Sequence, residues 1–142
     1  MQILNRKANF EYYFDDKYIA GIVLRGTEIK SIRNGKVSFA DSFCYFHHGE
    51  LYVKHLHIAV YDFGTHANHD PLRERKLLLN RRELRKLESK IKEKGYSIIP
   101  LKFLFSEKGI AKLEIGLGKG KKLYDKRETI KEREAKRHLK GQ

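Results

Sequence analysis

The chain has 142 residues, is 40% hydrophobic and 35% charged, and carries a formal net charge of +13 at pH 7. This length fits a single compact domain. The sequence has neither an apolar run of roughly 20 residues that could cross a bilayer nor the apolar stretch and cleavage site of a secretory signal. The single cysteine, Cys44, excludes an internal disulfide and a C-x-x-C zinc or redox motif. We therefore expect a soluble cytoplasmic protein whose positive charge attracts a polyanion, most commonly nucleic acid and less commonly an acidic membrane.

The N-terminal third is expected to form short strands separated by turns. The aromatic segment 10–14 and the mostly apolar segment 18–24 predict two strands, and the polar residues at 15–17 predict a turn between them. Thr27 is expected to cap a short helix. The Asn-Gly pair at 34–35 ends that helix, because both residue types tolerate a left-handed backbone.

The middle of the chain predicts a hairpin followed by a loop. Two β-prone segments, 42–46 and 51–58, flank a glycine-containing loop at 47–50, as in a hairpin. The segment 61–76 is polar throughout, and we expect it to be a loop.

The best-specified helix follows this loop. Asn80 is its expected N-cap, Glu83 completes a capping box, and Gly95 ends the helix. Apolar residues recur at helical spacing on one face, so this face should pack on the rest of the protein. The other faces are basic and carry Arg81, Arg82, Arg85, Lys86, Lys90, Lys92 and Lys94.

Segments 97–105 and 110–117 predict a second hairpin, with Pro100 at an edge or a bulge because proline cannot donate a ladder hydrogen bond. About six short strands with frequent turns are typical of a small barrel. The predicted fold is therefore mainly β with flanking helices. It consists of a small antiparallel barrel of the oligonucleotide-binding (OB) kind over residues 1–123 and a basic C-terminal tail, 124–142, that is disordered in isolation.

The histidines raise the question of a metal or hydrolytic site. His55 and His57 share one face of a predicted strand, and His66, His69 and Asp70 lie in a loop. A metal site needs three or four rigidly held ligands, which such a loop does not supply. A nuclease needs a general acid, a general base and usually metal-binding carboxylates, whereas the acids here are dispersed. We expect no catalytic residue, metal or cofactor, and keep a metal-dependent nuclease as a competing hypothesis.

Three features favour RNA as the polyanion. Residues 119–142 hold ten Lys or Arg against four acids, and the three scattered aliphatic side chains beyond residue 126 cannot form the apolar face of a membrane-binding helix. The glycines at 118 and 120 are expected to be flexible and to let the neighbouring lysines approach a phosphate backbone. Two or three aromatic side chains of the N-terminal strands should be exposed and could stack on unpaired bases. The aromatic set is Phe10, Tyr12, Tyr13, Phe14 and Tyr18.

Four stretches resemble a known family: NRKANFEYYF, AGIVLRGTEIKSIRNGKVSFADSF, HDPLRERKLLLNRRELRKL and LEIGLGKGKKLYDKRETIKERE. They are similar, in the same order, to the bacterial SsrA-binding proteins (small protein B), the partners of transfer-messenger RNA (tmRNA) in trans-translation. The resemblance implies an OB-like barrel that binds the tRNA-like domain of tmRNA and replaces its anticodon arm. It also implies a tail that enters the empty mRNA channel of a stalled ribosome and folds there. The implied partners are tmRNA, the small ribosomal subunit and, indirectly, elongation factor Tu with the aminoacylated RNA.

The resemblance also implies site residues. Those implied in RNA binding are Asn5, Arg6, Lys7, Tyr12, Leu78 and Lys112, to which the basic residues Lys119, Lys121 and Lys122 are added. Those expected at the ribosomal decoding centre and along the tail are Tyr124, Asp125, Lys126, Arg127, Ile130, Lys131 and Arg133. Two positions depart from the family pattern, because Ile19 stands where a glutamate is common and Phe10 where a histidine is common. The main alternative is a general OB-fold translation or RNA-binding factor without a dedicated tmRNA partner.

Overall fold

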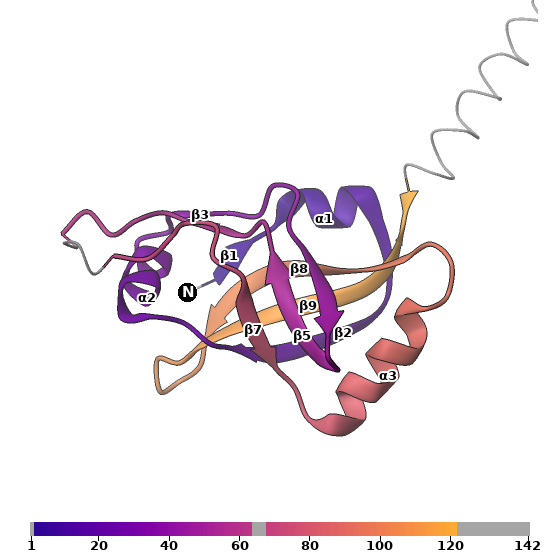
Figure 1. The fold of residues 1–142 in the computed structure, drawn as a ribbon. Helices are drawn as coiled ribbons and strands as arrows, with labels where there is room; N and C mark the ends of the chain where they lie inside the picture. Colours follow the sequence, from indigo (N-terminus) through magenta and orange to yellow (C-terminus); the bar gives the residue numbers. More distant parts are fainter. Residues whose placement is uncertain (1, 64–67, 122–142) are drawn as a thin grey trace, which may run out of the picture.

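Seven strands form one antiparallel sheet in the order β1-β8-β4-β5-β7-β2-β9, and the additional pairing of β8 with β9 closes it into a barrel (Figure 1). The computed structural model describes residues 2–63 and 68–121. The strands of this sheet are β1 (Gln2–Leu4), β2 (Tyr12–Ile22), β4 (Phe43–His47), β5 (Glu50–Lys54), β7 (Arg75–Leu78), β8 (Tyr96–Phe105) and β9 (Ala111–Gly120). Two short strands, β3 (Val37–Ser38) and β6 (His57–Ile58), pair separately. The barrel confirms the predicted fold class.

In the described ranges, three helices flank the barrel: α1 (Arg6–Glu11), α2 (Gly26–Arg33) and α3 (Arg81–Ile91). Figure 1 shows α2 and α3 at opposite ends of the barrel. Both bury apolar side chains in the main core, Ile32 from α2 and Leu87 from α3. The short α1 instead places Ala8 over a second, smaller cluster on the outside of the barrel, formed with Ile99 and Leu101. None of the helices in the described ranges is long and apolar enough to cross a membrane.

The hairpin signals and the predicted start of α3 are confirmed, whereas α3 ends at Ile91, before the expected Gly95. The β4–β5 hairpin turns at His48 and Gly49, both with a positive φ, as a two-residue type I′ loop requires. Asn80 caps α3 and accepts a hydrogen bond from the Glu83 backbone at 2.8 Å. The register of β8 against β9 shifts just after Pro100, which therefore lies at a bulge.

Other local predictions are wrong where tertiary pairing overrides local preference. The turn expected at 15–17 is absent, because β2 continues through it with a bulge after Phe14 and pairs with β9 on both sides of the bulge. Thr27 does not cap α2, which begins one residue earlier, at Gly26. The segment 51–58 is two strands instead of one, since His55 has a φ of 61°. The expected loop 61–76 ends in β7, and α1 was not predicted at all.

The glycines at 118 and 120 are paired residues of β9 and do not form the expected flexible segment. Gly118 is buried in the ladder, opposite Phe14 on β2 and Ser97 on β8. A Cβ atom at this position would lie 2.2 Å from the Tyr13 carbonyl oxygen and 2.8 Å from the Phe14 ring. Glycine at 118 is therefore needed because β2 and its aromatic side chain approach β9 closely.

Gly118→Ala is expected to lower the free energy of unfolding by about 1–3 kcal/mol, because the overpacked Cβ forces β2 away from β9. Urea unfolding measures this change. Gly120→Ala is the matched control, since the nearest atom to its added Cβ would be 3.9 Å away. We expect the control to change stability by no more than about 0.5 kcal/mol. Equal effects of the two substitutions would contradict the close approach at Gly118.

Candidate nucleic-acid interface

Strands β7, β2 and β9 lie side by side and bring two predicted RNA-binding residues together. Gly21 on β2 is opposite Leu78 on β7 and opposite Lys112 on β9. A Cβ atom on Gly21 would lie 3.3 Å from the Leu78 Cβ, so Leu78 packs against the bare glycine backbone. Leu78 remains 51% exposed. The row therefore places the apolar Leu78 side chain on one side of Gly21 and the Lys112 amine on the other, with no side chain between them.

The next row of the same face combines exposed apolar side chains with an ion pair. Ile19 is opposite Glu114, Glu114 is opposite Lys102, and Lys102 is opposite Leu4. Lys102 Nζ lies 3.6 Å from Glu114 Oε2. Ile19 and Leu4 are 56% and 52% exposed. We call the outer surface of Leu4, Ile19, Leu78, Lys102, Lys112 and Glu114 the barrel face. Four of these residues were not proposed as RNA-binding, although alternation along the predicted strand 110–117 indicates that Glu114 points to the same side as Lys112.

Asn5 is fixed at the start of α1 by two hydrogen bonds to β8. Its backbone N–H donates to the Leu101 carbonyl and its Nδ2 donates to the Pro100 carbonyl, both at 2.8 Å. Asn5 and Arg6 border a hollow of about 280 Å³ that Lys102 and Glu114 of the barrel face also line. These two predicted residues therefore adjoin the barrel face.

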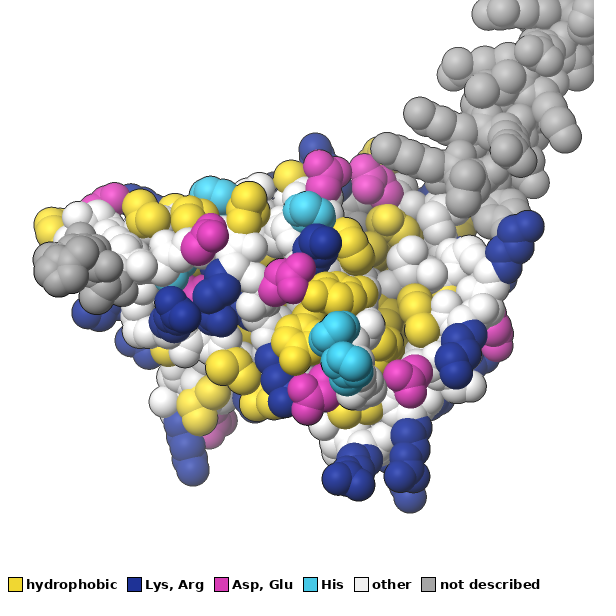
Figure 2. Space-filling view, viewed as in Figure 1, with side chains coloured by type: hydrophobic (Ala, Val, Ile, Leu, Met, Phe, Trp, Pro, Cys, Tyr) yellow, Lys and Arg dark blue, Asp and Glu magenta, His cyan; other side chains and the backbone are white. Residues whose placement is uncertain are grey.

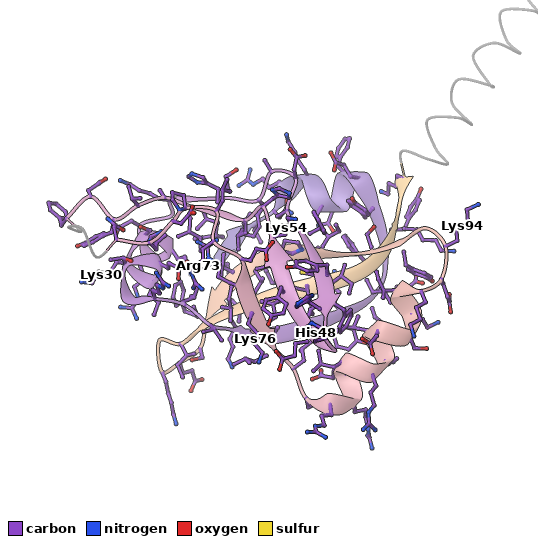
Figure 3. All side chains as sticks on the ribbon, viewed as in Figure 1. Lys30, His48, Lys54, Arg73, Lys76 and Lys94 are labelled. Atoms are coloured by element: carbon purple, nitrogen blue, oxygen red, sulfur yellow. The ribbon has the colours of Figure 1, made fainter. Side chains whose placement is uncertain are left out.

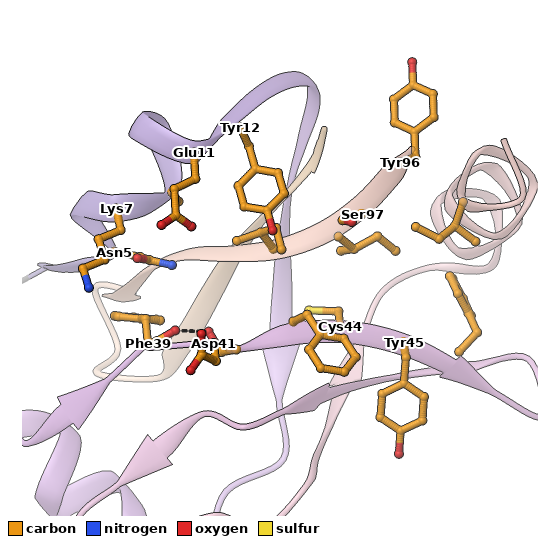
Figure 4. A pocket seen from close by; sticks show the side chains of 17 residues that line it. Asn5, Lys7, Glu11, Tyr12, Phe39, Asp41, Cys44, Tyr45, Tyr96 and Ser97 are labelled. Carbon is orange, nitrogen blue, oxygen red and sulfur yellow. Dashed lines mark hydrogen bonds between the residues drawn. The ribbon is translucent and has the colours of Figure 1, made fainter. Parts of the chain in front are cut away.

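Lys7 and Tyr12 line a second, larger groove of about 720 Å³, which Asn5 also lines (Figure 4). The groove lies between β4 and β8, which pair only through Cys44 and Ile98. The Tyr12 ring is half-buried and stacks on Phe14, with 5.9 Å between ring centroids. Burial and, secondly, the charge of Glu11 raise the pKa of Tyr12, so its hydroxyl stays protonated and can donate a hydrogen bond into the groove.

The prediction that two or three of the N-terminal aromatic side chains are exposed is confirmed. Of the five N-terminal aromatic residues, Phe10 and Tyr13 are exposed, at 85% and 54%. The rings of Tyr12, Phe14 and Tyr18 are partly buried against the two cores. Base stacking would therefore fall mainly to the exposed pair.

Lys119 and Lys121 lie at the far end of β9 from Lys112. Seven residues of strand separate Lys112 from Lys119, or about 23 Å, so these lysines do not belong to the barrel face. Lys119 Nζ lies 4.9 Å from the centre of the Tyr96 ring, and Lys121 Nζ lies 4.5 Å from that of Tyr13. Lys121 also donates to the Asn9 carbonyl at 3.1 Å. Both amines are thus held on the barrel by cation–π contacts.

Tyr96 is itself fixed by a hydrogen bond from its hydroxyl to the Asp15 carboxylate. This hydrogen bond, with smaller effects of burial and nearby acids, raises the pKa of Tyr96 to about 12. The chain therefore leaves the barrel from an ordered strand end. Lys122 and the predicted tail residues from Tyr124 to Arg133 lie outside the described residues.

A buried ionic cluster was missed by the sequence analysis. Glu28 on α2 is fully buried and accepts from Arg75 Nε at 2.5 Å and from Arg73 Nη2 at 2.6 Å. Arg75, also fully buried, donates to the Leu56 carbonyl at 2.6 Å. The cluster therefore ties α2 to β7 and to the chain before β6. Glu28 is 45 residues from Arg73 and 47 from Arg75, so no local pattern could indicate the pairing.

The histidines do not assemble into a metal site in the described part of the chain, where no group of three or more His, Cys, Asp or Glu side chains could hold an ion. His69 is buried, with Nε2 at 2.9 Å from the Ile58 carbonyl and Nδ1 at 2.8 Å from the Thr27 hydroxyl. These partners give His69 a role in joining the loop to α2. His47, His48, His55 and His57 are exposed, and His66 is outside the described residues.

Known proteins resemble this chain over nearly its whole length. The sequence model of the family described as SmpB protein matches residues 2–142. The chain belongs to the SmpB family. Proteins named SsrA-binding protein from Christiangramia forsetii, Phocaeicola vulgatus and Bacillus subtilis are 58%, 55% and 53% identical to it. The alignments cover 98%, 98% and 95% of this chain and 88%, 93% and 86% of these relatives.

A solved structure described as "tmRNA-SmpB: a journey to the center of the bacterial ribosome" contains a chain with the same fold. The TM-score is 0.74, the sequence identity is 50%, and the match covers 88% of this chain and 87% of that one. Both the sequence and the barrel geometry therefore agree with membership of the SmpB family.

Proposed function

We propose that this chain is an RNA-binding adaptor that binds the tRNA-like domain of tmRNA and is required for trans-translation rescue of stalled ribosomes. The observation that carries the proposal is the 50% identical chain of the same fold in the tmRNA-SmpB structure. In this proposal the barrel replaces the anticodon arm, and residues 124–142 enter the empty mRNA channel. Its partners are tmRNA and the small ribosomal subunit, with elongation factor Tu involved only through the aminoacylated RNA, and it works in the cytoplasm.

The barrel face is a suitable surface for a folded RNA. Lys112 and Lys102 offer ammonium donors to phosphates, and the exposed Leu78 and Ile19 can pack on sugars and on base edges. Because position 19 is an isoleucine here and not a glutamate, the acidic side chain in this row is that of its cross-strand neighbour Glu114. The proposal treats the chain as a binding protein and not as an enzyme, in line with relatives named for SsrA binding.

Equilibrium binding to two RNAs tests the proposal. The chain is expected to bind a transcript of the tmRNA tRNA-like domain more tightly than an unstructured RNA of equal length at the same salt concentration. Equal affinities would favour the general RNA-binding alternative. Lys112→Gln should weaken binding to the tRNA-like transcript by about 1–3 kcal/mol, the usual cost of leaving a buried hydrogen-bonding partner unsatisfied. Lys108→Gln, in the exposed β8–β9 turn, is the control and should bind as the wild type does.

A further inference from the structure

The outer surface of α3 carries three arginines that have no acidic partner among the described residues. Arg81, Arg82 and Arg85 are exposed, and no carboxylate in residues 2–63 and 68–121 lies within ion-pair distance of them. Further along α3, by contrast, Lys86 lies 4.0 Å from Asp16 and Lys90 lies 3.9 Å from Glu93. We call Arg81, Arg82 and Arg85 the α3 arginine cluster.

The fold does not need this cluster. The buried side of α3 is apolar and centred on Leu87, and the first turn is closed by Asn80 and Glu83. Arg81 and Arg85 are four residues apart, a spacing at which like charges on a helix destabilise it. Cations in the first turn also oppose the helix dipole. The cluster is thus mildly unfavourable in the free protein, and a polyanion would relieve both effects.

The cluster adjoins the barrel face. Leu78 is the last residue of β7, and α3 begins three residues later, at Arg81. The four residues from Leu78 to Arg82 span at most about 14 Å even if fully extended. Figures 2 and 3 show Lys and Arg side chains projecting from α3 away from the barrel at the lower edge of the molecule. One RNA helix lying on Leu78 can therefore reach the cluster.

The chemistry of this surface favours a phosphate backbone over an acidic protein. In residues 79–109, which include α3, no large hydrophobic side chain is strongly exposed. A stable protein–protein interface needs an apolar or aromatic centre, which α3 therefore does not offer. Guanidinium groups match phosphate oxygens in bidentate geometry.

We propose that the α3 arginine cluster binds the phosphate backbone of the same RNA that lies on the barrel face. This extends the interface from β9, β2 and β7 around the end of the barrel onto α3. The cluster positions the RNA without reading its sequence, as phosphate contacts do. The proposal rests on the proposed function, since it takes the RNA on Leu78 and Lys112 as its starting point.

The test is the salt dependence of binding of the full chain to the tRNA-like transcript. R81Q/R82Q/R85Q is compared with the control K92Q/K94Q/K108Q, which removes the same charge from exposed positions outside the α3 arginine cluster. We expect the arginine variant to bind about 10-fold or more weakly at 0.1 M KCl. The slope of log K against log salt concentration should decrease in magnitude by about 2–3, or nearly one for each lost phosphate contact. The control should shift both quantities much less.

Outcomes separate the two proposals. If wild type does not prefer the tRNA-like transcript to unstructured RNA, the proposed function itself fails. If wild type shows that preference but the two triple variants weaken binding equally, the effect is one of net charge and the α3 site is refuted. Glutamine preserves helix-forming tendency, and thermal unfolding of both variants confirms that a loss of binding is not a loss of fold.

Discussion

Glu28→Gln is expected to lower the free energy of unfolding by about 3–5 kcal/mol, the usual range when one partner of a buried ion pair is removed. The substitution removes the carboxylate that forms an ion pair with the fully buried Arg75. It also turns an amide toward the guanidinium N–H groups of Arg73 and Arg75, where the native carboxylate accepts. Urea unfolding at pH 7 measures the loss.

Glu74→Gln is the matched control for this prediction. Glu74 also faces a cation, Lys54 at 3.8 Å, but both side chains are more than 40% exposed. Exposed pairs contribute little, so the control should change stability by less than about 1 kcal/mol. A Glu28→Gln effect as small as that of Glu74→Gln would show that the buried cluster does not hold α2 on the barrel.

The stability difference between wild type and Glu28→Gln is also expected to depend on pH. Burial alone would raise the pKa of Glu28, but hydrogen bonds from Arg73 and the Arg25 backbone, and the charge of Arg75, outweigh it and lower the pKa below 4.5. A carboxyl with a lowered folded-state pKa stabilises the fold above its unfolded-state pKa, and this stability is lost as the pH falls through the folded-state pKa. The stability difference between wild type and Glu28→Gln should therefore narrow below pH 4.5.

Local signals in the sequence predicted those elements whose ends are determined by nearby residues. The Asn80–Glu83 capping box places the start of α3, and the turn at His48 and Gly49 places the β4–β5 hairpin. The polar segment 15–17 misled for a physical reason. Its residues favour turns in isolation, but pairing of β2 with β9 supplies ladder hydrogen bonds before and after the bulge, and strand propensity depends strongly on such context.

The residues of the candidate interface are brought together by the register between strands, which cannot be predicted from any single segment. Leu78, Gly21 and Lys112 come from three strands and meet only because β7, β2 and β9 are neighbours in the barrel. The resemblance to a family supplied Leu78 and Lys112, whereas composition supplied Lys119 and Lys121, which the structure holds at the other end of β9. Counting cations therefore grouped residues that do not form one surface.

Truncation after Leu123 is expected to abolish rescue of stalled ribosomes while changing affinity for the tRNA-like transcript by no more than about threefold at 0.15 M salt. The barrel face and the lysines held on Tyr96 and Tyr13 all precede the cut. The seven cations and four acids that are removed act on RNA bound at the barrel face only over distances that salt screens beyond about 8 Å. Peptide tagging on an mRNA without a stop codon measures rescue, and equilibrium binding measures affinity.

Two full-length variants determine what the tail contributes. A chain in which residues 124–142 are shuffled keeps length, composition and charge but loses the order from Asp125 to Arg127, so it should fail in tagging as the truncation does. Rescue by the shuffled chain would mean that the tail acts only through its charge. Replacing Asp125, Lys126 and Arg127 by alanine should also abolish tagging at unchanged RNA affinity. A large loss of RNA affinity in any of these proteins would instead place RNA recognition in the tail and contradict its assignment to the barrel.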